Sequence, residues 1–149
     1  MKLIAFRAPA LPFNPNKIVV GGEARLALWC HLKGEGWPEG YSARDHDYLV
    51  ISREKSRPAQ GLPRRGETDL IRAPSIAHYF ENIDLITNQV AVYRGKIITT
   101  EGCVACFKRG STVINGSNKK LALNGVVYFQ YLLLRACVQT GFFISDKVY

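Results

Sequence analysis

An apolar run that ends in two glycines is the feature that most constrains how this chain folds. Lys17–Val20 is predicted to form a short buried strand, and Gly21-Gly22 follow it directly. Glycine lets the backbone turn tightly and approach a ligand closely. Glu23–Lys33 then carries apolar residues on one helical face. A strand, a glycine turn and a helix are therefore expected, with the N–H groups of the helix N-terminus available to phosphates.

Two aspartates lie at the entrance of the next predicted strand, Tyr48–Ile51. On an extended segment Asp45 and Asp47 point the same way, because side chains alternate between faces. Two carboxylates that close repel each other, and a divalent cation relieves the repulsion. Mg²⁺, or Mn²⁺ in its place, bound by these two residues together with substrate phosphates is the expected arrangement.

A third carboxylate would complete a catalytic site for phosphoryl chemistry. The next predicted strand, Glu67–Arg72, offers two candidates again one residue apart, Asp69 and Glu67. Asp69 is expected to join Asp45 and Asp47 as a catalytic residue, with Glu67 as its competitor.

Other patterns extend this mixture of strands and helices. Gln89–Tyr93 and Lys96–Thr100 are predicted to form a hairpin around an Arg-Gly turn. Thr112–Asn115 is predicted to form one more edge strand. Leu121–Thr140 is the longest predicted helix, and it is apolar nearly all round. Such a helix is expected to be buried within the domain or in a homodimer.

Length and charge bound the class of protein. A chain of 149 residues is expected to form one domain, residues 1–149. The net charge of +8 favours a polyanionic partner such as a nucleotide or RNA, with a basic solvated surface as the alternative. No apolar stretch is long enough to cross a membrane, and no signal peptide is recognisable, so a cytoplasmic protein without a membrane partner is expected.

The four cysteines are expected to be reduced thiols rather than a disulfide framework. Cys103 and Cys106 have the spacing of half a zinc site, but no second pair matches it. Buried thiols in a strand are the favoured interpretation.

A basic loop, Arg53–Gly66, joins the strand that follows the aspartates to the next strand. It is expected near the rim of the site, where it would contact phosphate or RNA; a solvated face is the alternative. The RNA-binding candidates are Arg53, Lys55, Arg57, Arg64 and Arg65.

Taken together, these segments resemble the head domain of the class II CCA-adding enzyme and bacterial poly(A) polymerase family. Gly21-Gly22 and Arg25, followed by the two aspartates, are similar to the family's GGxVRD motif and DxD strand. Ile83–Thr99 resembles the RRDFTINALAY segment and its hairpin, and Leu132–Ile144 resembles the LRAxRFxxxxGF helix that closes the head.

The resemblance implies a polymerase-β-like nucleotidyltransferase fold in the α/β (α+β) class, a small mixed sheet backed by helices. It implies transfer of a nucleoside monophosphate from a nucleoside triphosphate such as ATP to an RNA 3′ end, with tRNA as the favoured acceptor. Gly21, Gly22 and Arg25 would line the triphosphate. Asp84 and Asn88 would contact the nucleotide's sugar or hold the site in shape.

The chain departs from the family pattern in ways that leave other functions open. Leu26 stands where the family has an acid, and Asn82 and Ile83 stand where it has two arginines. The base-selecting EDxxR motif has no counterpart. Two alternatives to the enzyme follow: a catalytically degenerate module that binds nucleotide or RNA, and a toxin-like transferase that modifies tRNA or a protein.

Overall fold

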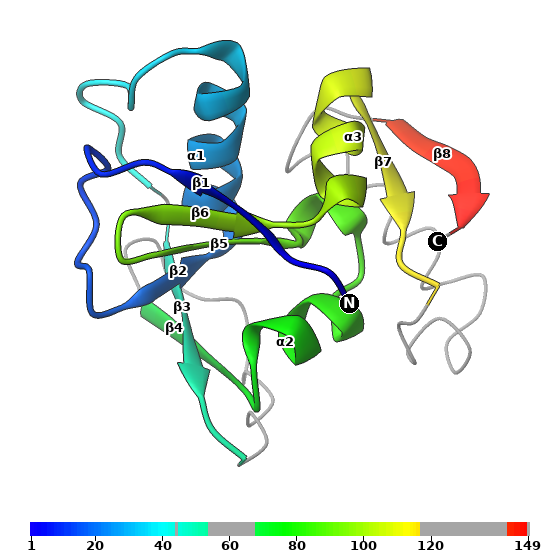
Figure 1. The fold of residues 1–149 in the computed structure, drawn as a ribbon, viewed down its shortest axis with the longest axis horizontal. Coiled ribbons are helices and arrows are strands. Elements are labelled where there is room, and N and C mark those ends of the chain that lie inside the picture. Colours follow the sequence, from blue (N-terminus) through cyan, green and yellow to red (C-terminus); the bar gives the residue numbers. More distant parts are fainter. Residues whose placement is uncertain (44, 54–67, 117–142, 149) are drawn as a thin grey trace.

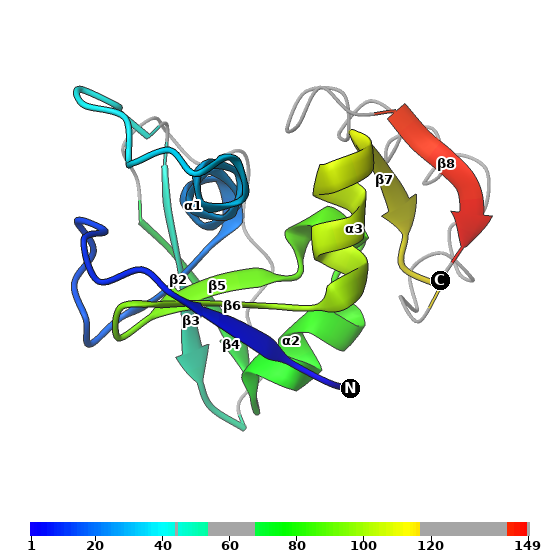
Figure 2. The same cartoon turned by 45° about the horizontal axis from the view of Figure 1, so that its top comes forward.

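The computed structural model describes residues 1–43, 45–53, 68–116 and 143–148. They form a mixed α/β fold in which a six-stranded sheet carries α1 and α3 on one face and α2 on the other (Figures 1 and 2). The elements are β1 (Ile4–Arg7), β2 (Ile18–Val20), α1 (Gly21–Lys33), β3 (His46–Ile51), β4 (Thr68–Ala73), α2 (Ile76–Asn82), a 3-10 turn (Ile86–Asn88), β5 (Val90–Tyr93), β6 (Lys96–Thr99), α3 (Glu101–Arg109), β7 (Ser111–Ile114) and β8 (Phe143–Val148).

The sheet has the strand order β1-β6-β5-β2-β3-β4. All neighbouring strands are antiparallel except β3 and β4, which run parallel with Asp47 opposite Asp69. The hairpin of β5 and β6 forms as predicted, and its turn residues Arg94 and Gly95 both have positive φ, at 49° and 70°. The small mixed sheet backed by helices that the resemblance implied is therefore present.

Alternation along the strands divides the core into two clusters. One face of the sheet, with Val19, Val92 and Ile97, packs under α1 and α3. The other face, with Val20 and Leu49 among its buried residues, packs under α2. Because side chains alternate, Asp47 and Asp69 lie on the α2 face, at the end of the sheet where β3 and β4 begin.

The assignment of the buried thiols to a strand is wrong: Cys103 and Cys106 lie on helix α3. Thr100 caps this helix by accepting a hydrogen bond from the Cys103 N–H at 3.1 Å, and Gly110 ends it in the left-handed conformation. The two thiols and Phe107 have the i, i+3, i+4 spacing of one helical face, which is buried against the sheet.

Two further elements differ from the predictions. The predicted edge strand near Thr112 is β7, which pairs with β8 in a separate two-stranded parallel sheet. Helix α1 begins at Gly21, so the two glycines form its first turn instead of preceding it. The predicted helix Leu121–Thr140 lies outside the described residues, and with it the homodimer contact assigned to that helix.

Candidate active site

Asp47 lies directly against Gly21. Asp47 is opposite Val20 in the β2–β3 pairing, and Gly21 is the next residue along the chain. A Cβ atom built on Gly21 would overlap the Asp47 Oδ2. Gly21 also has φ +71°, a conformation that side chains strongly disfavour. Glycine is therefore required here twice, for its backbone conformation and for the close approach of the carboxylate.

Asp45 and Asp69 complete a group of carboxylates around Asp47. Burial, together with the negative charges of Asp45, Asp69 and Glu23 and against the opposing charge of Arg25, raises the pKa of Asp47 from 3.8 to about 6. Asp47 therefore lies beside the diglycine with Asp45 close enough to act on it, and the β3–β4 register adds Asp69 from the neighbouring strand. Glu67, its competitor, lies outside the described residues.

The carboxylates do not by themselves form a closed metal centre. Within the described part of the chain, no three His, Cys, Asp or Glu side chains converge as a metal-binding group. Mg²⁺ characteristically takes one or two carboxylates and completes its shell with water and substrate phosphates. The donor set of Asp45 and Asp47 fits that kind of open site. The charge of Asp45 makes ionisation of Asp47 unfavourable, and a bound cation would neutralise both carboxylates.

Glu23 is a site residue that sequence reasoning missed. Its Oε1 lies 2.7 Å from the Nδ1 of His46, and its side chain is only 11% exposed. The pair joins the first turn of α1 to the start of β3, the two elements that hold Gly21 and Asp47. The available signal was an acid in the first turn of the helix, a position that the helix dipole favours.

Arg25, Asn88 and Asp84 form one hydrogen-bonded chain. The Arg25 Nη1 donates to the Asn88 Oδ1 at 2.6 Å, and the Asn88 Nδ2 donates to the Asp84 Oδ1 at 3.1 Å. Asp84 and Asn88 are buried, at 6% and 3% exposure. Two segments far apart in the sequence thus meet here. The buried Asn88 holds the Arg25 guanidinium, whose positive charge acts on Asp47.

The remaining predicted site residues are only partly described. Gly22 is the second residue of α1, and a Cβ there would meet only the Arg25 Nη2 at an ordinary 3.5 Å. Arg53 is exposed just after β3. The other basic-loop candidates, Lys55, Arg57, Arg64 and Arg65, lie outside the described residues, so their contact with phosphate or RNA stays a prediction.

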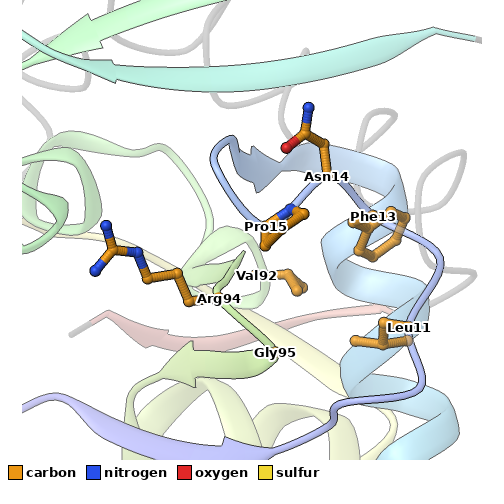
Figure 3. Close-up of a pocket in the computed structure, with 7 residues that line it drawn as sticks. All are labelled: Leu11, Phe13, Asn14, Pro15, Val92, Arg94 and Gly95. Carbon is orange, nitrogen blue, oxygen red and sulfur yellow. The ribbon is translucent and has the colours of Figure 1, made fainter.

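A shallow pocket with a cavity volume of only about 10 Å³ lies at the opposite end of β2. Figure 3 shows Leu11, Phe13, Pro15 and Val92 around it, with the Arg94 guanidinium pointing away. Ligand pockets are usually larger, about 300–1,000 Å³. The pocket borders the loop before β2, whereas Asp47 is opposite the last residue of β2, so it is not part of the carboxylate site.

Comparison with known proteins identifies the fold but not a family. No protein-family model matches the chain, and no curated protein matches it. Among solved structures, one described as a tRNA-processing enzyme in an apo form is similar, with 14% identity and a TM-score of 0.50. The similarity covers 87% of this chain and 42% of that one, so this chain spans less than half the length of that protein. At this identity the likeness shows a shared fold.

None of the helices in the described ranges has the length and apolar character needed to cross a membrane.

Proposed function

We propose that the chain is a metal-dependent nucleotidyltransferase that moves a nucleoside monophosphate from a nucleoside triphosphate to an RNA 3′ end, with tRNA as the favoured acceptor. The observation that carries the proposal is the Asp47 carboxylate held against Gly21, with Asp45 and Asp69 beside it. The shared fold with a protein described as a tRNA-processing enzyme supports RNA as the acceptor.

Asp45 and Asp47 would hold Mg²⁺ or Mn²⁺, with Asp69 as the neighbouring third carboxylate. When bound there, the metal would lower the pKa of the attacking hydroxyl and neutralise charge on the leaving pyrophosphate. An ionised Asp47 beside two further acids is electrostatically costly, and a cation would remove that cost.

The first turn of α1 would bind the triphosphate. Its N-cap, Val20, has no hydrogen-bonding side chain to occupy the terminal N–H groups. Gly22 carries no side chain to block approach to these groups, which together with the helix dipole favour a phosphate. Arg25 would add a positive charge, oriented through its hydrogen bond to Asn88.

The proposal is tested by incorporation of labelled ATP or CTP into tRNA and into other RNAs with Mg²⁺ or Mn²⁺. Asp45→Asn and Asp47→Asn should each reduce transfer by at least about 100-fold, since loss of one group that stabilises transition-state charge costs that much. Glu39→Gln, which removes an exposed acid from the loop after α1, is the matched control and should retain activity. Absence of transfer to every RNA tested would contradict the proposal.

A catalytically degenerate module that binds nucleotide or RNA is the second candidate. It is favoured by Leu26 in place of the family's acid and by Asn82 and Ile83 in place of its two arginines. This function predicts nucleotide or RNA binding without turnover, little affected by Asp47→Asn. Metal binding separates the two functions. If the carboxylates hold the ion, Mg²⁺ should raise the melting temperature of the wild type but not that of the Asp45→Asn/Asp47→Asn variant. If they do not, Mg²⁺ should leave both melting temperatures unchanged.

A further inference from the structure

A cluster of three cations lies at the β5–β6 turn, away from the carboxylates. Arg7 on β1 is directly opposite Lys96 on β6, and Lys96 is opposite Tyr93 on β5. Residues opposite one another on antiparallel strands share a face. Arg94 adds a third cation, with its guanidinium 5.0 Å from the centre of the Tyr93 ring.

The fold holds these cations in place. The Ala8 N–H donates to the Gly95 carbonyl at 2.7 Å, which ties the end of β1 to the hairpin turn. A Cβ at Gly95 would lie 3.4 Å from the Pro9 Cα, so the segment after β1 packs closely against the hairpin turn. The turn lies on the side of the molecule away from α3 and β7 (Figures 1 and 2), and the Arg94 side chain points away from the neighbouring pocket (Figure 3).

The segments around these cations are free of acidic residues. The two stretches that build the cluster, residues 1–22 and 85–100, contain no Asp or Glu. Arg7, Arg94 and Lys96 are all exposed, and none forms an ion pair with an acidic residue in the described ranges. Like charges directly opposite on paired strands destabilise a sheet, so an anion bound between them would relieve a cost that the free protein carries.

Protection of a sheet edge accounts for only part of the cluster. Charged residues on edge strands prevent strands of other chains from pairing. That explanation serves Arg7, because β1 is an edge strand, but β6 is internal to the sheet and Arg94 lies in a turn.

We propose that Arg7, Arg94 and Lys96 form a surface that binds the phosphate backbone of RNA. The choice of RNA rests on the proposed function, and the chemistry fits it, because guanidinium groups bind phosphate in a bidentate manner and stacking on Tyr93 fixes the guanidinium of Arg94. Contacts to phosphates position an RNA without reading its bases. The surface therefore binds RNA independently of its sequence. It contacts a part of the acceptor RNA that is distant from the reacting 3′ end.

The test is binding of a labelled single-stranded RNA in EDTA, where no metal is bound and no transfer occurs. The variant Arg7→Gln/Arg94→Asn/Lys96→Gln removes the cluster, and asparagine suits the positive φ of residue 94. The control Lys2→Gln/Lys33→Gln/Lys108→Gln removes equal charge from exposed positions away from this turn; Lys2 lies 3.9 Å from Glu101, and Lys33 stacks on Trp29. Equal melting temperatures establish that both variants are folded.

The cluster variant should bind RNA about 10- to 100-fold more weakly at ~0.1 M salt, and its salt slope should fall by about 2, as expected for loss of three single-strand phosphate contacts. The control should stay near the wild type, and RNAs of different sequence should bind alike. Equal losses in both variants would overturn the proposal, as would binding to anionic lipid vesicles without binding to RNA. Transfer activity is not measured, so failure of this proposal is distinguishable from failure of the nucleotidyltransferase proposal.

Discussion

Replacement of Asp47 by asparagine should stabilise the protein at neutral pH while it abolishes transfer. Burial and neighbouring acids raise the pKa of Asp47 from 3.8 to about 6. Each tenfold change in proton affinity is worth about 1.4 kcal/mol, so the rise corresponds to about 3 kcal/mol. Because Asp47 is only partly buried, solvent screening reduces this to about 1–2 kcal/mol.

The sign follows from the direction of the pKa change. A carboxyl whose pKa is raised on folding contributes stability below its unfolded pKa of 3.8 and loses it as the pH rises through about 6. Above that value the wild type carries the full cost of an ionised Asp47, whereas Asp47→Asn carries none. The stabilisation in the variant should therefore be complete at neutral pH and vanish below 3.8.

The assay is thermal or urea unfolding of wild type and Asp47→Asn across this pH range, without divalent metal. A gain of about 1–2 kcal/mol corresponds to a rise in melting temperature of about 3–8 °C at neutral pH. Glu39→Gln controls for the loss of one negative charge from a basic protein. If Asp47→Asn is no more stable than the wild type at neutral pH, or if its effect is the same at all pH values, the electrostatic argument for the site is wrong.

Three further predictions concern the surroundings of the site. Gly21→Ala should destabilise the fold by about 1–3 kcal/mol, because of its positive φ and its overlap with the carboxylate above it, whereas the matched Gly22→Ala should cost little; equal unfolding free energies for the two would contradict this. Asn88→Ala should cost about 1–3 kcal/mol in chemical denaturation, since it leaves a buried carboxylate and a guanidinium without their shared partner. Cys103 and Cys106 should resist alkylation in the native protein, because burial raises the pKa of both thiols and raises that of Cys103 to about 12. Rapid labelling of either cysteine, detected by mass spectrometry, would contradict the burial of this face of α3.

The carboxylate site shows how far local pattern reaches. Asp45 and Asp47 were identified because alternation on an extended segment points them the same way; the structure sets Asp47 against Gly21, with Asp45 close enough to raise its pKa. Which carboxylate lies opposite Asp47 is decided by the register of β3 and β4. Asp69 was named without that register, and the parallel pairing places it there.

Helix α3 shows where local pattern misled. Over so short a span its cysteines are compatible with a strand or a helix. The hydroxyl of Thr100, which caps the helix, is the sequence signal that favours a helix and that was overlooked. Strand β1 was not predicted at all, although it sets Arg7 opposite Lys96. Its apolar residues form a strand because β6 offers an edge to pair with, which no short window of sequence reveals.

The sequence by itself determined the strand and helix around the diglycine, the hairpin, and the strand that carries Asp47, because these follow from residue-to-residue periodicity and turn chemistry. Only the tertiary structure decided which groups meet: Asp47 with Gly21, Arg25 with Asn88 across 63 residues, and Arg7 with Lys96. Such neighbours are selected by burial of the whole core and by strand register, and these are properties of the folded chain rather than of any one segment.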